Sequence, residues 1–311
     1  MNKMPAILRR FHGGRLIGKI VIYAVLILIS YQFLYPILRM ISLSIMSERD
    51  ITDPSVTWIP RSMTFNNLRV AALTLDLRKT LTGSFLFSAA LALCQTFVSA
   101  LTGFAFARYE FPGKRVWFIM VLLSFIIPTP VVIIPRVMMF TGVQESWGPQ
   151  LIGTPIPQIL LAIFGQGVYS AVLILISYNF TRMIPRALDE AASIDGANAF
   201  QVFVHVILRL SVPTLLILFL FSFVWNWNES YLTTTFLRGK IPLLPQRLVM
   251  FDSLFESYGQ GSGSVQSPQF RINEAYKMAG TLISILPLLA IYMFVQKHFI
   301  KGIENAGITG E

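Results

Sequence analysis

A run of nineteen consecutive residues, 20–38, carries no charge and lies between Lys19 and Arg39. At 1.5 Å per residue, a helix of this length reaches about 28 Å, close to the roughly 30 Å hydrocarbon thickness of a bilayer. A run this long is typical of a membrane span and exceeds what a helix in a soluble core needs. The segment therefore predicts a transmembrane helix.

The whole chain shares this apolar character. Hydrophobic residues make up 54% of it, charged residues only 13%, and the mean hydropathy is +0.64, whereas globular domains carry about 25% charged residues. Such a composition indicates a membrane protein. The net charge of +10 does not indicate nucleic-acid binding, because the basic residues lie between apolar runs and form no continuous face. The single cysteine, Cys94, excludes an internal disulfide and a Cys-based zinc site.

Five further runs have the polarity of membrane spans, and they lie at 81–106, 116–135, 158–180, 210–224 and 278–296. Pro128 and Pro130 lie within the second of these runs, where proline forces a kink or break in a spanning helix. The sequence therefore predicts an all-α membrane protein with six transmembrane helices. Residues 1–80 would hold a cytoplasmic segment, the first span and an external loop. Residues 81–311 would hold the transmembrane core, with a long internal loop at about 182–209.

Basic residues predict the orientation of the spans. Lys3, Arg9, Arg10, Arg15 and Lys19 precede the first span without any acidic residue among them. Basic residues accumulate on the cytoplasmic side of membrane proteins. With an even number of spans, both termini are then expected in the cytoplasm.

The internal loop predicts a short helix followed by a sharp bend. Pro185 suits the first position of a helix, 186–194 contains good helix formers, and Gly196 can adopt the left-handed backbone that ends one helix and redirects the chain. Small residues on this helix let a partner approach closely, and acidic ones can meet basic groups on that partner. These residues are Ala187, Asp189, Glu190, Ala191, Ala192 and Asp195. The helix looks like a docking element, although its EAASIDG segment alone is equally typical of an exposed turn.

In context, the segment resembles the EAA loop of ABC importer permeases. The matching positions are Glu190, Ala191, Ala192, Gly196, Val206 and Leu208. Arg209 stands where that family usually has proline, and Pro213 follows four residues later. Segments 104–115 and 227–229 resemble the carbohydrate branch of the family, and in particular the smaller six-helix permease of maltose-type importers.

This resemblance implies a type I (MetI-like) permease fold in a bacterial inner membrane, with the EAA loop as a coupling helix in a cleft of a separate ATPase. Glu190 would contact the ATPase, Ala191 and Ala192 would allow close docking, and Gly196 would make the turn, with Asp189 and Asp195 in the same coupling set. The implied partners are a second homologous permease subunit, two ATPase subunits, an extracytoplasmic binding protein that delivers a sugar, and membrane lipid. ATP and magnesium would bind to the ATPase, and no cofactor to this chain.

No GxxxxGK[ST] sequence occurs, so the chain lacks a phosphate-binding loop and is not expected to be an enzyme. A secondary transporter would typically carry inverted repeats and an ionisable residue near mid-membrane. An intramembrane enzyme would need an acid, base or metal set within its spans. The predicted spans favour neither alternative, while an ABC importer for a non-sugar solute stays open.

Four residues are candidates for the solute pathway. Trp225, Trp227 and Asn228, at the outer end of the fifth span, can stack on and hydrogen-bond a sugar, or belong to an interfacial aromatic belt. Arg136, at the outer end of the broken third span, can pair with the carboxylate of an acidic oligosaccharide such as a uronate, or extend to lipid headgroups.

Overall fold

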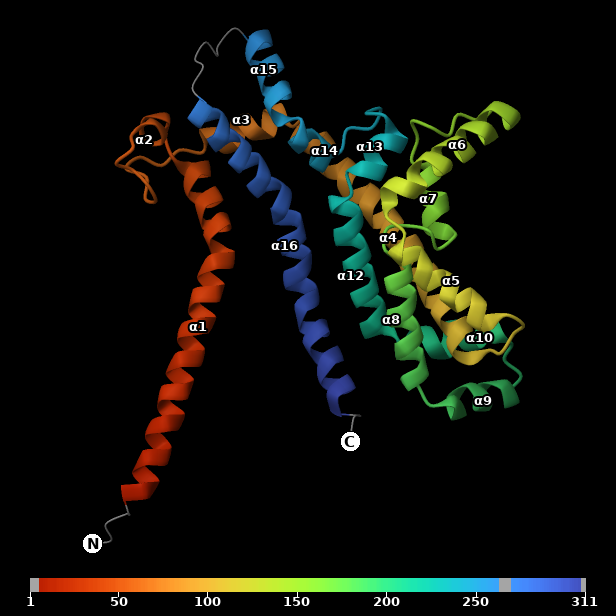
Figure 1. Cartoon of the computed structure of the whole chain (residues 1–311). Coiled ribbons are helices and arrows are strands. Elements are labelled where there is room, and N and C mark those ends of the chain that lie inside the picture. The colour runs from red at the N-terminus through yellow and green to blue at the C-terminus, as the bar shows by residue number, and fades with distance from the viewer. Residues whose placement is uncertain (1–5, 263–269, 309–311) are drawn as a thin grey trace. The chain divides into compact units, whose positions relative to one another are not determined.

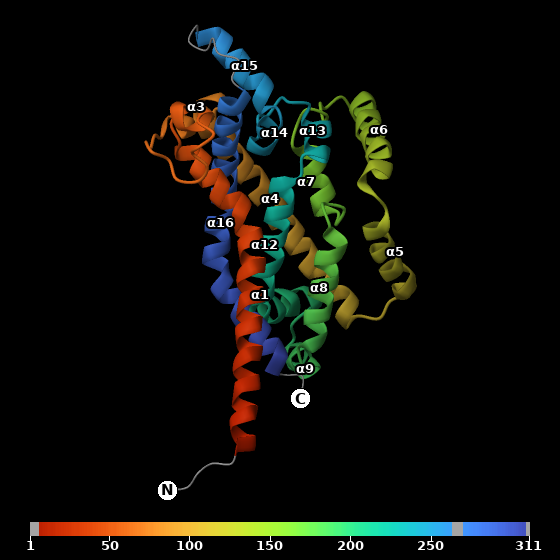
Figure 2. The ribbon, with the colours of Figure 1, turned by 60° about the vertical axis from the view of Figure 1, so that its left-hand side comes forward.

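The computed structural model describes residues 6–262 and 270–308, which are largely helical. The chain forms two compact units, one of residues 1–74 with 255–283 and one of residues 75–254 with 284–311. Figures 1 and 2 show the ribbon from two directions. Lys3, one of the basic residues ahead of the first predicted span, lies outside the described residues.

The first unit contains α1 (Ala6–Ile45), α2 (Glu48–Thr52), α3 (Asn66–Thr74), most of α15 (Phe251–Ser262) and the first part of α16 (Phe270–Ile308). Leu43, Met46 and Ile51 form a buried cluster with Ala275, against which Met278 also packs. This contact between distant segments groups 255–283 with the N-terminal region. The units therefore divide the chain differently from the predicted boundary at residue 80.

Most of the described apolar surface of α1 is exposed. Its stretch Gly18–Ile45 is 28 residues long and apolar enough to cross a membrane, and none of its most apolar window is buried. Leu28 and Phe33, for example, are 69% and 76% exposed. An apolar surface of this extent requires lipid or a protein partner around it. The helix predicted at 20–38 is confirmed.

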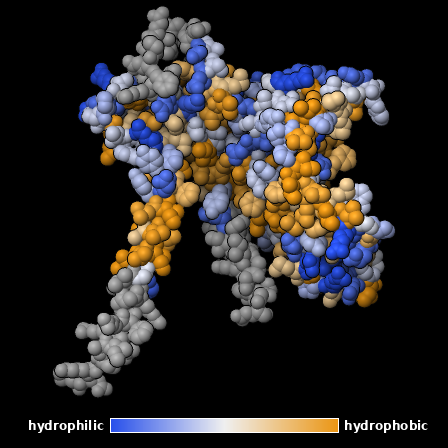
Figure 3. Space-filling view, in the orientation of Figure 1, coloured by the Kyte–Doolittle hydropathy of each residue, from blue (hydrophilic) through white to orange (hydrophobic). Residues whose placement is uncertain are grey.

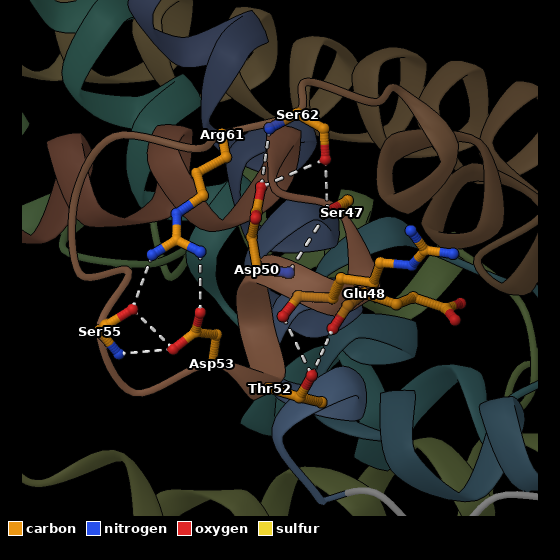
Figure 4. A network of polar contacts seen from close by, with 9 residues as sticks. Ser47, Glu48, Asp50, Thr52, Asp53, Ser55, Arg61 and Ser62 are labelled. Carbon is orange, nitrogen blue, oxygen red and sulfur yellow. Dashed lines mark hydrogen bonds and ion pairs between the residues drawn. The ribbon is translucent and has the colours of Figure 1, made fainter.

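Polar contacts order the loop between α2 and α3 (Figure 4). Asp50 is buried and accepts a hydrogen bond from the backbone N–H of Ser62 at 2.9 Å. That bond is the main reason why the pKa of Asp50 lies below its usual value. Arg61 forms an ion pair with Asp53 at 3.1 Å and donates to Ser55 at 2.9 Å. The segment predicted as an external loop is thus a folded cap with its own hydrogen-bond network.

The second unit is built around the long helix α4 (Leu77–Arg108), which packs against α7 (Ile156–Ile163), α8 (Ser170–Met183) and α12 (Val212–Asn228). Both ribbon views show α8 and α12 running beside each other (Figures 1 and 2). The remaining helices that lie wholly in this unit are α5 (Lys114–Ile126), α6 (Thr129–Trp147), α9 (Arg186–Ile194), α10 (Ala199–Val202), η1 (Phe203–Ile207), α11 (Leu208–Leu210), α13 (Tyr231–Leu237) and α14 (Leu244–Val249). On the face that Figure 3 draws, a hydrophobic surface lies between hydrophilic patches.

Helices α4 and α8 approach closely at Gly103. A Cβ atom at this position would lie 2.6 Å from Ser177 Oγ and 2.7 Å from the backbone nitrogen of Tyr178. Gly103→Ala is therefore expected to destabilise the protein by about 1–3 kcal/mol through overpacking, which thermal unfolding in detergent measures. Gly142→Ala is the control, since its Cβ would meet nothing within 4 Å. Equal melting temperatures for the two variants would contradict the close packing.

One predicted span is sharply bent, and a second sharp bend lies at the start of another. α5 and α6 meet at 106°, and Pro128 caps α6, so the break predicted from Pro128 and Pro130 is confirmed. The segment Ala199–Leu210 meets α12 at 84°. The described residues contain three helices able to cross a membrane, or up to five if each bent pair is one span. The count of six therefore stays a prediction.

The prediction of one continuous span at 158–180 is wrong, because α7 ends at Ile163 and α8 begins only at Ser170. Gly165 has φ +69, and the N–H of Gln166 donates to the carbonyl of Leu161 at 2.7 Å. This left-handed glycine turn closes α7 as helix C-terminal glycines commonly do. An uncharged run alone gave no sign of the interruption.

Candidate functional site

The predicted short helix is confirmed as α9, with Pro185 at its N-cap. Gly196 has φ +87, and its N–H donates to Ser193 at 3.1 Å, while the N–H of Ala197 donates to Ala192 at 3.0 Å. These two bonds form a Schellman motif, which satisfies the last carbonyls of a helix. A Cβ at Gly196 would meet nothing within 4 Å. Backbone conformation, and not lack of space, therefore favours glycine here.

A second helix starts directly after this turn. Asn198 caps α10, accepting from the N–H of Gln201 at 2.9 Å while its own N–H donates to the Gln201 side chain at 2.8 Å, which completes a capping box. The chain continues through the π-helix η1 and α11 into the bend at Ser211. Val202, Phe203 and Ile207 are almost fully buried against α4 residues that include Phe104. The loop after α9 is thus a fixed part of the second unit.

Asp189 of α9 pairs with Arg108 at the end of α4. The Arg108 Nε lies 2.6 Å from Asp189 Oδ2, and the side chains are only 6% and 18% exposed. Arg108 also donates from Nη2 to the carbonyl of Ile184 at 2.7 Å. Burial raises the pKa of Asp189, and Arg108 opposes that rise. The structure therefore gives Asp189 a partner within its own chain, where the sequence suggested a basic group on another protein.

The outer face of α9 is exposed and carries both apolar and charged side chains. Glu190 and Ala191 are exposed, and Ile194 is 86% exposed. Ala192 instead packs partly against the cluster around Phe203, so it does not lie on the free face with Ala191. Asp195 and Gly196 are exposed at the C-terminal end of the helix. Both ribbon views show α9 lying across the end of α8 (Figures 1 and 2).

A shallow groove of about 420 Å³ runs along this helix, lined by Arg108, Tyr109, Arg186, Asp189, Glu190, Ser193 and Ile194. Burial and the nearby Asp189 raise the pKa of Tyr109. The groove combines the side chains of Ile194 and Tyr109 with charged groups of both signs. An exposed helix of this kind can bind a partner surface that offers a complementary cleft.

Arg136 lies elsewhere in the second unit, half-buried on α6. Its Nη2 donates to Gln166 Oε1 at 3.3 Å. Both residues line a cavity of about 90 Å³ between α5, α6, the α7–α8 turn and the start of α13. Trp225 packs edge-on against Tyr169 at 5.0 Å, and Tyr169 lines the same cavity. Arg136 therefore lines the cavity, and Trp225 packs against Tyr169, which lines the same cavity.

The assignment of Trp227 to the pathway is wrong. Its side chain is only 2% exposed and its ring packs on Phe223 at 5.7 Å, so it is a core residue that reaches neither a solute nor an interfacial belt. Asn228 is exposed, but its Nδ2 donates to the carbonyl of Val224 one turn earlier at 2.9 Å. Positions 225, 227 and 228 point in different directions from the helix, so Trp227 lies in the core while Asn228 is exposed.

A buried polar cluster escaped the sequence analysis. Gln95 Oε1 accepts hydrogen bonds from Ser222 Oγ and, at 2.8 Å, from Asn226 Nδ2, and all three side chains are buried. Gln95 also donates to the carbonyl of Val168 at 3.4 Å, in the α7–α8 turn. The available signal was the presence of amide side chains in apolar runs. In the part of the chain that the structure describes, no three His, Cys, Asp or Glu residues gather as a metal site.

Comparison with known proteins decides the class of the molecule. The family model described as the inner membrane component of binding-protein-dependent transport systems matches residues 96–305, which include α9 and Arg136. The chain belongs to this family. It is a multi-pass inner membrane component, and the prediction that ATP hydrolysis is carried out by another subunit is confirmed by the family.

Several relatives of this transport component are similar along nearly their whole length. The maltodextrin transport system permease protein MdxG of Bacillus subtilis is 26% identical, over 96% of this chain and 98% of the relative. The polygalacturonan/rhamnogalacturonan transport system permease protein YtcP of the same organism is 23% identical, over 93% and 97%. A chain in the crystal structure of a bacterial ABC transporter for import of the acidic polysaccharide alginate superimposes with a TM-score of 0.73, at 21% identity, over 96% of this chain and 100% of that one. The all-helical permease fold is thereby confirmed.

Proposed function

We propose that this chain is a permease subunit of an ATP-driven importer that translocates an oligosaccharide. The named functions of its relatives, in maltodextrin and polygalacturonan/rhamnogalacturonan transport, support a carbohydrate solute over other solutes. The observation that carries the proposal is α9, an exposed helix in the family's matched region that is fixed to the transmembrane bundle. Such a helix can transmit the movement of a bound partner to the membrane-spanning helices.

The proposed assembly contains a second homologous permease, two ATPase subunits that bind ATP and magnesium, and an extracytoplasmic binding protein that delivers the solute. Six spans with both termini in the cytoplasm fit the distribution of basic residues. The exposed apolar surfaces of α1 and α5 would face lipid or the second permease. No nucleic acid has a place in this assembly.

In the coupling step, α9 docks in a cleft of the ATPase. Glu190 meets a basic group there, Ala191 permits close approach, and Ile194 adds apolar contact from the free face. Asp195 and Gly196 lie at the rim and form the turn. Asp189 acts on the other side of the helix, where Arg108 ties α9 to α4, and the cluster around Phe203 ties the following segment to the same helix. ATP-driven closure of the ATPases would thereby move α4.

Glu190→Lys tests this docking. The substitution places a positive charge against the expected basic partner, so association with the ATPase should weaken by about tenfold or more, equivalent to at least about 1.4 kcal/mol. Co-purification of the assembled ATPase with the permease measures the effect. Glu110→Lys, in the loop after α4, is the control for an exposed acid changed to a base. Equal co-purification of Glu190→Lys and wild type would contradict the docking role.

A further inference from the structure

Arg136 carries a positive charge that the protein leaves largely uncompensated. It lies half-buried on α6, within one of the bent pairs that qualify together as a span. Among the described residues, no carboxylate lies within ion-pair distance of Arg136, and its recorded partner is the neutral amide of Gln166. An unpaired guanidinium in an apolar segment is costly, so a position of this kind calls for a ligand or an exit to water.

The cavity beside Arg136 offers polar groups from several elements. Gln166 comes from the interrupted α7–α8 region, and Ser124 and Ser170 contribute hydroxyl groups from α5 and α8. Glu229 also lines the cavity, and its Oε1 already accepts the N–H of Leu232 at 2.8 Å. Its other oxygen can accept from a sugar hydroxyl. The set suits a ligand that is both anionic and rich in hydroxyl groups.

Aromatic rings form one side of this site. Tyr169 has φ +51, an uncommon backbone conformation for a non-glycine residue, and its ring lines the cavity. It contacts Trp225 edge-on at 5.0 Å and Phe125 at 6.3 Å, and Trp225 stacks on Phe221 at 5.5 Å. Tyr169 is 52% exposed, so its ring has free surface beyond these contacts. An aromatic face with a polar handle is suited to the apolar face of a sugar ring.

We propose that Arg136 and Gln166 form a subsite for the carboxylate of a uronate residue, with Tyr169 packing against the sugar ring. The cavity of about 90 Å³ has room for a carboxylate group beside Arg136 and Gln166, and the sugar ring would lie against Tyr169. The planar guanidinium binds a carboxylate through two parallel hydrogen bonds. This inference rests on the proposed function and narrows its solute to an acidic oligosaccharide.

An anionic lipid headgroup presents related chemistry to an arginine. We assign the subsite to a sugar, because Gln166, Glu229 and the hydroxyl groups add hydrogen-bonding capacity for a polyhydroxylated ring. If lipid were the ligand, the effect of Arg136 would depend on anionic phospholipid and not on the charge of the solute. The two sources are therefore separable in vesicles of defined composition.

The test uses the full complex in proteoliposomes of phosphatidylcholine, with and without phosphatidylglycerol. ATP-dependent uptake of trigalacturonate is compared with uptake of its methyl ester, which has the same backbone without the charges. Arg136→Gln should lower trigalacturonate uptake by about tenfold to a hundredfold, the value of a charge-assisted hydrogen bond, and leave uptake of the ester within about twofold. Arg136→Lys should recover only part of the loss, because lysine lacks the planar fork. Arg78→Gln, which removes an exposed charge on α4, is the control.

Selective loss of trigalacturonate uptake in both kinds of vesicle would support the subsite. Equal loss of both solutes, no loss of either, or a loss that appears only with phosphatidylglycerol would overturn it while leaving the importer intact. A wild-type complex that carries the ester but not the acid would also overturn it. Failure of the wild-type complex to carry any oligosaccharide would instead overturn the proposed function itself.

Discussion

Asp189→Asn or Arg108→Gln is expected to lower the free energy of unfolding by about 3 kcal/mol and to reduce ATP-dependent uptake. Removing one partner of a buried pair leaves the other charge uncompensated, which costs about 3–5 kcal/mol, and the 18% exposure of Asp189 places the value at the lower end. Loss of the pair also frees α9 from α4. Thermal unfolding in detergent and uptake per ATP hydrolysed measure the two effects.

The Lys114–Glu110 ion pair is the matched control, because it is just as short at 2.7 Å while the Glu110 side chain is 84% exposed. Glu110→Gln should change stability by less than about 1 kcal/mol. The defect of Arg108→Gln should shrink at mildly acidic pH. Burial raises the pKa of Asp189 and Arg108 opposes this, so without Arg108 the acid takes up a proton more readily and loses its unpaired charge. Variants as stable and as well coupled as wild type would contradict the anchoring role.

Gly196→Val should abolish most transport while the protein still inserts in the membrane. A β-branched residue at φ +87 is strained, at a cost of about 1–3 kcal/mol, and relief of the strain would open the turn after α9. Gly196→Asn is the matched variant, because asparagine tolerates left-handed backbone, and it should keep most of the activity. Uptake normalised to the amount of permease in the membrane separates coupling from insertion.

Normal uptake by Gly196→Val would show that the turn is not required. Equal loss in Gly196→Val and Gly196→Asn would point to a need for space and not for backbone freedom. The second outcome conflicts with the open surroundings of Gly196, where a Cβ meets nothing within 4 Å.

Locally determined features were predictable from the sequence. The α9 helix, its end at Gly196 and the break at Pro128 depend on residues within a few positions of one another, and propensity and capping rules act over that range. The apolar runs likewise predicted the three long helices, because bilayer thickness sets their length.

Features that depend on distant contacts were not predictable. Asp189 lies on the loop expected to bind an ATPase, and only the folded chain brings Arg108 to it. The core position of Trp227 depends on the packing of α12, which an aromatic pattern near a span end does not reveal. The interruption between α7 and α8 is different, because it is a local turn at Gly165. It was missed because glycine within an apolar run is also compatible with a continuous helix.

ATP-dependent oligosaccharide uptake in proteoliposomes tests the central claim most directly. This chain would be reconstituted with a second permease, two ATPase subunits and the binding protein, or alone, and uptake of labelled oligosaccharide and release of phosphate would be followed. Uptake should require ATP and every subunit, and the chain alone should neither hydrolyse ATP nor accumulate sugar. Accumulation by the chain alone, driven by a proton or sodium gradient without ATP, would contradict the account and identify a secondary transporter.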